Sequence, residues 1–150
     1  MAIVSAENQF KKGLEALVDE NFVEAALHFR RAIDVEHQRR VTQPDMRYLS
    51  YYGLCRAKAH GRLEEGIHAC RRAARCRPLD PEMFYNLGRV YLAARRRQMA
   101  LQAFEEGLRV DPEHAGLKRE SSRLAARLPR SGGGLLSRVR AVWSRPLTSH

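Results

Sequence analysis

Residues 81–114 read PEMFYNLGRVYLAARRRQMALQAFEEGLRVDPEH, and this stretch decides the fold. The pattern F-Y-N-L-G-x-x-Y opens its first half, and A-x-x-x-F-x-x-G lines its second half. These spacings place apolar and small side chains on one face of each of two short helices. Arg95–Arg97 fall between the halves, at the expected turn, and Pro112 comes after the second half, where a proline ends a helix. The stretch therefore predicts a helical hairpin.

The same spacing occurs twice more, earlier in the chain. Aligning backward by 34 residues places Pro78 where the later proline falls, which makes residues 47–80 a second copy. A third copy fits at 6–39, where His37 replaces the closing proline. Residues 40–46 are left between these two copies. An insertion of this kind predicts a surface loop.

The order and spacing of these motifs resemble the tetratricopeptide repeat (TPR), a family that packs helix against helix in units of about 34 residues. The resemblance implies an all-α, right-handed superhelix of three helix-turn-helix units. Residues 115–128 predict a further helix that covers the apolar end of the last repeat with Leu117, Leu124, Ala125 and Leu128. We expect a TPR domain over 6–128, a flexible linker over 129–134 and a separate basic, amphipathic tail over 135–150.

Small residues recur where the two helices of each unit would cross. We expect Gly13 and Gly88 to lie opposite small residues of the second helix, namely Ala25, Gly66 and Ala100. Phe29 and Phe104 would fill the space around each crossing. A larger side chain at such a crossing would push the helices apart.

The net charge of +10 is unevenly distributed along the 150 residues. Residues 40–80 carry nine basic and four acidic residues, and 115–150 carry eight and one, whereas 81–114 are neutral. This asymmetry indicates an anionic partner or surface. The N-terminus lacks the features of a signal peptide, no apolar run is long enough to span a membrane, and three cysteines without C-x-x-C spacing suit a reducing compartment. These features predict a cytoplasmic protein.

The TPR resemblance also implies a concave groove built from the first helix of each repeat. Its lining is aromatic and aliphatic with two central cations, and tyrosine and arginine often anchor interfaces. A peptide or helix with apolar anchors and an acidic group would suit it. The alternatives are that some tyrosines only pack against neighbouring helices, or that the chain's own tail covers them. The candidate groove residues are Phe10, Leu14, Leu17, Tyr48, Tyr51, Cys55, Lys58, Tyr85, Arg89 and Leu92.

One TPR subfamily binds the acidic C-termini of chaperones through basic residues and asparagines at particular groove positions. At the matching positions this chain has Phe10, Leu14, Tyr52, Glu82 and Asn86. Asn86 alone is of a suitable type. The sequence therefore argues against this dicarboxylate clamp.

The tail over 135–150 predicts a short amphipathic helix with cations flanking its apolar face. It could lie on an anionic membrane surface, dock on a partner, fold back into the groove or remain disordered. The first option makes a peripheral membrane-associated scaffold the alternative to a groove-binding adaptor, and self-association through a terminal repeat face is a third option. The candidate contact residues are Leu135, Leu136, Arg138, Val139, Arg140, Val142 and Trp143.

The sequence contains no pattern that favours catalysis or a cofactor. It has no phosphate-binding loop, no H-E-x-x-H and no G-x-S-x-G, and its six histidines lack metal-ligand spacing. The arginines of the second repeat are expected on a solvated outer face, without interleaved aromatics, so nucleic acid is not favoured as a partner. Cys70 and Cys76 are expected in the core and Cys55 in the groove. We therefore expect a protein that is not an enzyme and holds no metal.

Overall fold

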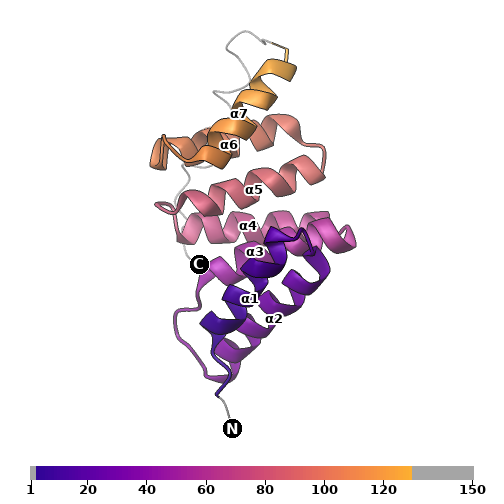
Figure 1. Ribbon diagram of the computed structural model, residues 1–150. Coiled ribbons are helices and arrows are strands. Elements are labelled where there is room, and N and C mark those ends of the chain that lie inside the picture. The colour runs from indigo at the N-terminus through magenta and orange to yellow at the C-terminus, as the bar shows by residue number, and fades with distance from the viewer. Residues whose placement is uncertain (1–2, 130–150) are drawn as a thin grey trace.

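A computed structural model describes residues 3–129. This part of the chain forms seven α-helices, arranged as three hairpins and one final helix (Figure 1). The hairpins stack in chain order from the N-terminal end, so the predicted all-α repeat fold is confirmed. The helices are α1 (Ala6–Val18), α2 (Phe22–Gln38), α3 (Met46–His60), α4 (Leu63–Cys76), α5 (Pro81–Ala93), α6 (Arg97–Val110) and α7 (Ala115–Arg127).

Helix ends follow local sequence signals. Asp80 caps α5 by accepting a hydrogen bond from the Glu82 backbone N–H at 3.1 Å, and Pro81 occupies the first turn, where no backbone donor is needed. The helices α4 and α6 each have 14 residues and end two positions before Pro78 and Pro112. No proline stops α2, which runs for 17 residues.

The predicted surface loop between the first two repeats is anchored at its end. Asp45 caps α3, and its backbone N–H donates to both carboxylate oxygens of Glu36 at 3.2 and 3.0 Å. Arg47 donates to the same aspartate and also reaches Glu7 of α1 at 3.1 Å. Hydrogen bonds therefore tie the end of the loop to α1 and α2.

The two helices of the first and third hairpins meet through a phenyl ring and a bare glycine. A Cβ atom on Gly88 would lie 2.7 Å from Cζ of Phe104, and one on Gly13 would lie 2.8 Å from Cζ of Phe29. Both rings are fully buried. The atoms nearest to each glycine therefore belong to the predicted phenyl ring, which occupies the space that the glycine leaves.

The second hairpin solves the same packing problem differently. The position of Gly88 is taken by Leu54, and that of Phe104 by Cys70, so a large residue and a small one have exchanged helices. Here two glycines bring the backbones together. A Cβ on Gly66 would lie 2.7 Å from the carbonyl oxygen of Gly53. The helices α3 and α4 are thus held at backbone contact.

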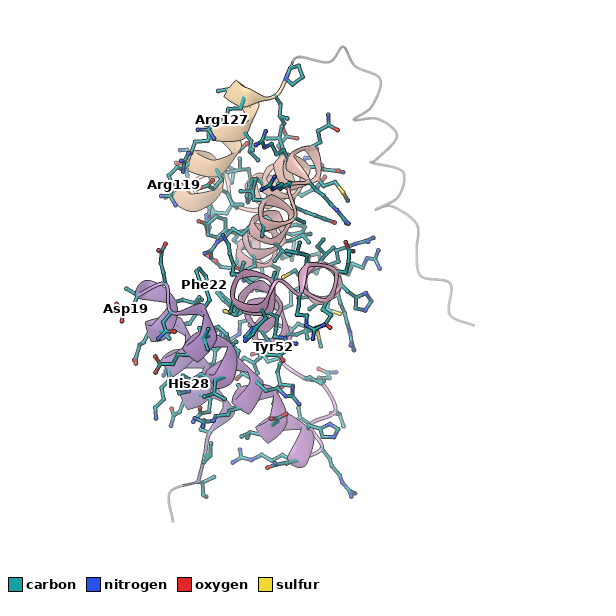
Figure 2. All side chains as sticks on the ribbon, turned by 90° about the vertical axis from the view of Figure 1, so that its right-hand side faces the viewer. Asp19, Phe22, His28, Tyr52, Arg119 and Arg127 are labelled. Carbon is teal, nitrogen blue, oxygen red and sulfur yellow. The ribbon has the colours of Figure 1, made fainter. Side chains whose placement is uncertain are left out.

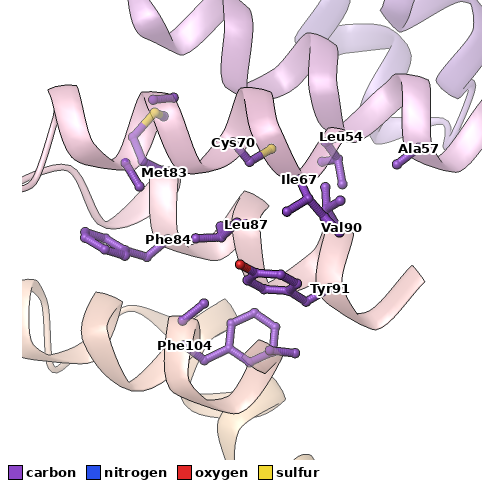
Figure 3. Close-up of a cluster of buried hydrophobic side chains, with 14 of the residues drawn as sticks. Leu54, Ala57, Ile67, Cys70, Met83, Phe84, Leu87, Val90, Tyr91 and Phe104 are labelled. Atoms are coloured by element: carbon purple, nitrogen blue, oxygen red, sulfur yellow. The ribbon is translucent and has the colours of Figure 1, made fainter. Parts of the chain in front are cut away.

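The buried side chains of the described residues form two clusters, one centred on the first repeat and one that runs from α3 to α7, and the partly buried Tyr51 packs against both. Leu54, Ile67 and Val90 meet where the second repeat joins the third, and Leu87 and Phe104 continue the cluster through the third hairpin (Figure 3). Leu117 and Leu124 of α7 extend it to the last helix, as predicted. Ala125 is exposed, contrary to the prediction, because it lies one residue past Leu124 and so turns away from the buried face.

Cys76 was also misplaced by the sequence analysis. It is exposed, whereas Cys70 is fully buried. Cys76 lies six residues after Cys70, which at 100° per residue places it about 120° around α4 from the buried Cys70. The predicted tail, with all of its candidate contact residues, lies outside the described residues, as does the predicted linker after Pro129.

Replacing Gly66 with alanine tests the backbone contact in the second hairpin. The added methyl group improves helix propensity by about 1 kcal/mol but collides with a carbonyl group that cannot swing away. Overpacking of this kind costs about 1–3 kcal/mol. We expect Gly66→Ala to lower the free energy of unfolding, measured by urea denaturation. His68→Ala, at an exposed position of the same helix, should change it by no more than about 0.5 kcal/mol. An unchanged or raised stability in Gly66→Ala would contradict the close approach.

Candidate functional site

The candidate groove residues divide into a surface set and a buried set. The surface set, called the first-helix face below, is partly or fully exposed on α1, α3 and α5, and consists of Leu14, Leu17, Tyr51, Lys58, Tyr85, Arg89 and Leu92. The buried set consists of Phe10 and Tyr48, each 4% exposed, and Cys55, which is 0% exposed. These three side chains lie in the core and offer a partner almost no contact area.

An aromatic cluster explains why two of them are buried. The ring of Phe10 lies 5.6 Å from that of Phe29, 5.1 Å from that of Tyr48 and 5.4 Å from that of Tyr51. Tilted and edge-on pairs at such distances are favourable arrangements of aromatic rings. The Tyr48 hydroxyl also donates to Glu7 at 3.0 Å. Phe10 and Tyr48 therefore join the first repeat to the second.

Tyr51 has both a structural contact and an accessible edge. Its hydroxyl donates to Oε2 of Glu82 at 3.2 Å, which ties α3 to α5. Burial raises the pKa of this phenol well above its usual value, and the nearby Glu82 carboxylate adds to the shift. Tyr51 therefore stays neutral and acts as a hydrogen-bond donor, while its partly exposed ring contributes to the first-helix face.

Arg89 is the central cation of this face. Its guanidinium carbon lies 5.3 Å from the centroid of the Tyr85 ring, a cation–π contact. Within residues 3–129 no carboxylate forms an ion pair with Arg89 or with Lys58, whose ammonium group lies 5.8 Å from the Phe22 ring centroid. Two positive charges on this face thus lack an acidic partner in the described chain.

His114, a polar residue at the end of the face, was not predicted from the sequence. Its Nδ1 accepts the Leu117 backbone N–H at 3.1 Å and so caps α7, which leaves the proton on Nε2. That nitrogen donates to Oε1 of Glu82 at 2.7 Å. The side chain therefore links α5 to α7. Its place directly before a predicted helix was the available signal, since capping residues stand there.

Comparison with protein families identifies the repeats. Two models described as tetratricopeptide repeat match the sequence, one over residues 81–114 and the other over 10–81. The chain belongs to the tetratricopeptide repeat family. No curated protein sequence is similar enough to count as a match.

Solved TPR structures share the fold at low sequence identity. The Sgt2 TPR domain from Aspergillus fumigatus is 14% identical, with a TM-score of 0.65 and coverage of 97% of this chain and 87% of that one. The Arabidopsis OM64 TPR domain is 15% identical, with a TM-score of 0.64 and coverage of 82% and 96%. The first TPR of Spaghetti (RPAP3), solved bound to the HSP90 peptide SRMEEVD, is 12% identical, with a TM-score of 0.63 and coverage of 82% and 92%. At these identities the likeness shows the fold.

Asn86 was the one residue of this TPR protein that suited a dicarboxylate clamp. It is fully buried, and its amide nitrogen donates to the Ser50 hydroxyl at 3.2 Å between α5 and α3. Its burial leaves it no surface to offer a peptide. The structure thus adds a physical reason to the sequence-based argument against the clamp.

The described TPR repeats show no arrangement suited to metal binding or to membrane crossing. Nowhere in residues 3–129 do three histidine, cysteine or acidic side chains group closely enough to hold a metal ion. None of the helices in this part of the chain combines the length and apolar character needed to cross a bilayer.

The three thiols should differ sharply in reactivity. Burial raises the pKa of Cys55 to about 12, opposed in part by Arg89, and raises that of Cys70 to about 12. At pH 8 a thiol of that pKa is about one part in 10⁴ thiolate, and the thiolate is the nucleophile. We therefore expect Ellman's reagent to modify Cys76 alone in the native protein at pH 8.

The matched control is Cys76→Ser, which should abolish the fast reaction. Because both buried pKa values are raised, reaction at Cys55 and Cys70 should appear only as the pH rises well above 8 or when the protein unfolds. Three native thiols reacting at similar rates at pH 8 would show that the core is not closed around them.

Proposed function

We propose that this TPR protein is a non-enzymatic adaptor that binds a peptide or helix of a protein partner along the first-helix face. The observation that carries the proposal is Arg89, a partly exposed guanidinium that stacks on Tyr85 and forms no ion pair with a carboxylate in the described chain. A cation kept on a surface without an acidic neighbour is available to an acidic group of a partner.

The chemistry of the surrounding surface supports this assignment. Tyr85, on whose ring Arg89 stacks, and Tyr51 are both partly exposed, and Leu92 adds aliphatic area. Tyrosine and arginine dominate the energetics of many interfaces because they combine a large contact area with directed polar groups. The preferred ligand has apolar side chains for the tyrosines and a carboxylate for Arg89 or Lys58.

A similar TPR structure also supports a peptide as the ligand. The first TPR of Spaghetti (RPAP3) was solved with a bound HSP90 peptide. Asn86 is buried and therefore not available to a dicarboxylate clamp, so the partner would be recognised through tyrosines and single cations instead. We therefore infer the same kind of partner, a peptide, but different contacts. A cytoplasmic location remains part of the proposal.

The membrane alternative rests on the sequence of the tail alone. Residues 135–150 contain three arginines, one tryptophan and no acidic residue. Such a tail, acting as a second anchor, would raise overall avidity without altering the first-helix face. Liposome flotation of the full chain, with and without residues 130–150, distinguishes a peripheral membrane scaffold from a groove-binding adaptor.

Charge reversal at Arg89 tests the proposed function. We expect Arg89→Glu to weaken binding of the partner captured by the full chain from lysate at least about tenfold, because its acidic group would then face a negative charge. Arg75→Glu, an identical charge change at an exposed position of α4, is the matched control and should leave binding intact. Equal binding by both variants would refute a role for the first-helix face.

A further inference from the structure

The outer surface of α2 carries two large apolar side chains in water. Val23 is 61% exposed and Leu27 is 50% exposed, and the two are one helical turn apart. Residues four apart on a helix lie on the same face, so the two side chains form one apolar patch. We call it the α2 patch.

The other repeats show what this position carries when it is simply solvated. Glu64 and His68 of α4 stand at the places of Val23 and Leu27 in the repeat, and Gln98 and Gln102 of α6 stand there in the third repeat. This face of the second helix is therefore polar in the second and third repeats and apolar in the first. Nothing in the hairpin packing requires the apolar pair, because both side chains point away from the core.

The α2 patch forms one wall of a groove. The opposite wall comes from α3, and the groove has a volume of about 560 Å³. Tyr52 of α3, labelled in Figure 2, lines this groove, and its hydroxyl accepts a hydrogen bond from Arg30 of α2 at 3.5 Å. The groove is lined by Asn21, Val23, Glu24, Ala26, Leu27, Arg30, Tyr52, Arg56 and His60.

This groove lies on a different side of α3 from the first-helix face. Tyr52, Arg56 and His60 follow each other at intervals of four residues, whereas the first-helix face uses Tyr51 and Lys58. At 100° per residue, the two rows of side chains are separated by roughly 150° around the helix. A ligand in one site would not occupy the other.

The charges of the groove favour an acidic ligand. The lining of the groove contains two arginines, Arg30 and Arg56, and one acidic residue, Glu24. Arg30 pairs with Asp34 at 3.0 Å, in an ion pair whose side chains are 58% and 49% exposed. One oxygen of Glu24 accepts a hydrogen bond from Asn21 at 2.8 Å. The carboxylate beside Arg56 belongs to Glu65, lies 3.5 Å away and is 61% exposed. Since exposed ion pairs of this kind are weak, the carboxylate of a ligand can replace it. The guanidinium of Arg56 also lies 6.0 Å from the Tyr52 ring centroid, which holds it at the edge of the groove.

We propose that this groove docks a short acidic amphipathic helix of a protein partner. Apolar residues three or four apart on that helix would cover Val23 and Leu27 and contact the Tyr52 ring. Carboxylates beside the apolar stripe would pair with Arg56 and Arg30. This arrangement is the helix-in-groove mode of recognition, with complementary charge setting the orientation. The chain's own tail does not fit, because its charged residues are all arginines.

Selection from a display library of helical peptides against the full chain tests the proposal. We expect the enriched peptides to share an apolar i, i+4 pair flanked by Asp or Glu. Their affinity should fall at least about tenfold for the variant Val23→Gln with Leu27→Gln, which installs the residues that α6 carries at the same places. Because those residues are native to the third repeat, the variant should keep the fold, which circular dichroism checks.

Two further measurements separate this site from the first-helix face. Arg89→Glu should leave the affinity of the selected peptides unchanged within about twofold, so failure of the proposed function would not affect this result. Replacing the Asp and Glu of a selected peptide by Gln and Asn should weaken it at least about tenfold, with no change to the protein.

The following outcomes would overturn the proposal. Selected peptides could be basic or uncharged, or could bind the double-glutamine variant as tightly as the parent chain. The full chain could dimerise through this face, with the dimer lost in the double-glutamine variant. Anionic vesicles could bind the parent chain and not that variant, which would make the groove a membrane contact.

Discussion

The contact between a phenyl ring and a bare glycine backbone sets the geometry on which the rest of this structure depends. In the first and third hairpins, Phe29 and Phe104 fill the space left by Gly13 and Gly88. The ring fixes both the separation and the rotation of the two helices, because it is fully buried and cannot move aside. That rotation determines which side chains of the first helix point into the core and which reach the surface.

The second hairpin shows that the constraint concerns volume rather than residue identity. There a leucine and a cysteine replace the glycine and the phenylalanine, and Gly53 and Gly66 bring the backbones into contact.

The sequence predicted the hairpins and their order, because repeat spacing and prolines are local signals. It did not predict that Phe10, Tyr48 and Cys55 are buried. Repeat position gives the direction of a side chain, whereas burial depends on how neighbouring repeats tilt together. The α2 patch was not predicted from the sequence. The repeats were aligned on the positions where they carry similar residues, and Val23 and Leu27 occupy positions where the repeats differ.

Some polar side chains of this protein form hydrogen bonds between repeats, and others lie on the surface without an acidic partner in the described chain. Glu7 and Glu82 accept hydrogen bonds from tyrosines of the next or the preceding repeat, so they join the repeats together. Arg89 and Lys58 have no such acidic partner within residues 3–129, which leaves positive charge on the first-helix face. The groove beside α2 also carries two arginines next to apolar side chains, but each of them pairs with an exposed carboxylate. Both proposals therefore assign acidic partners to this chain, in keeping with its net charge of +10.

The coupling between positions 88 and 104 tests the central claim most directly. Urea denaturation of Gly88→Ala, Phe104→Leu and the double variant gives three changes in unfolding free energy. If the ring occupies the space above the glycine, removing the ring makes room for the methyl group. The double variant should then be more stable than the sum of the single effects predicts, by about 1 kcal/mol or more. Effects that add within about 0.5 kcal/mol would contradict the account.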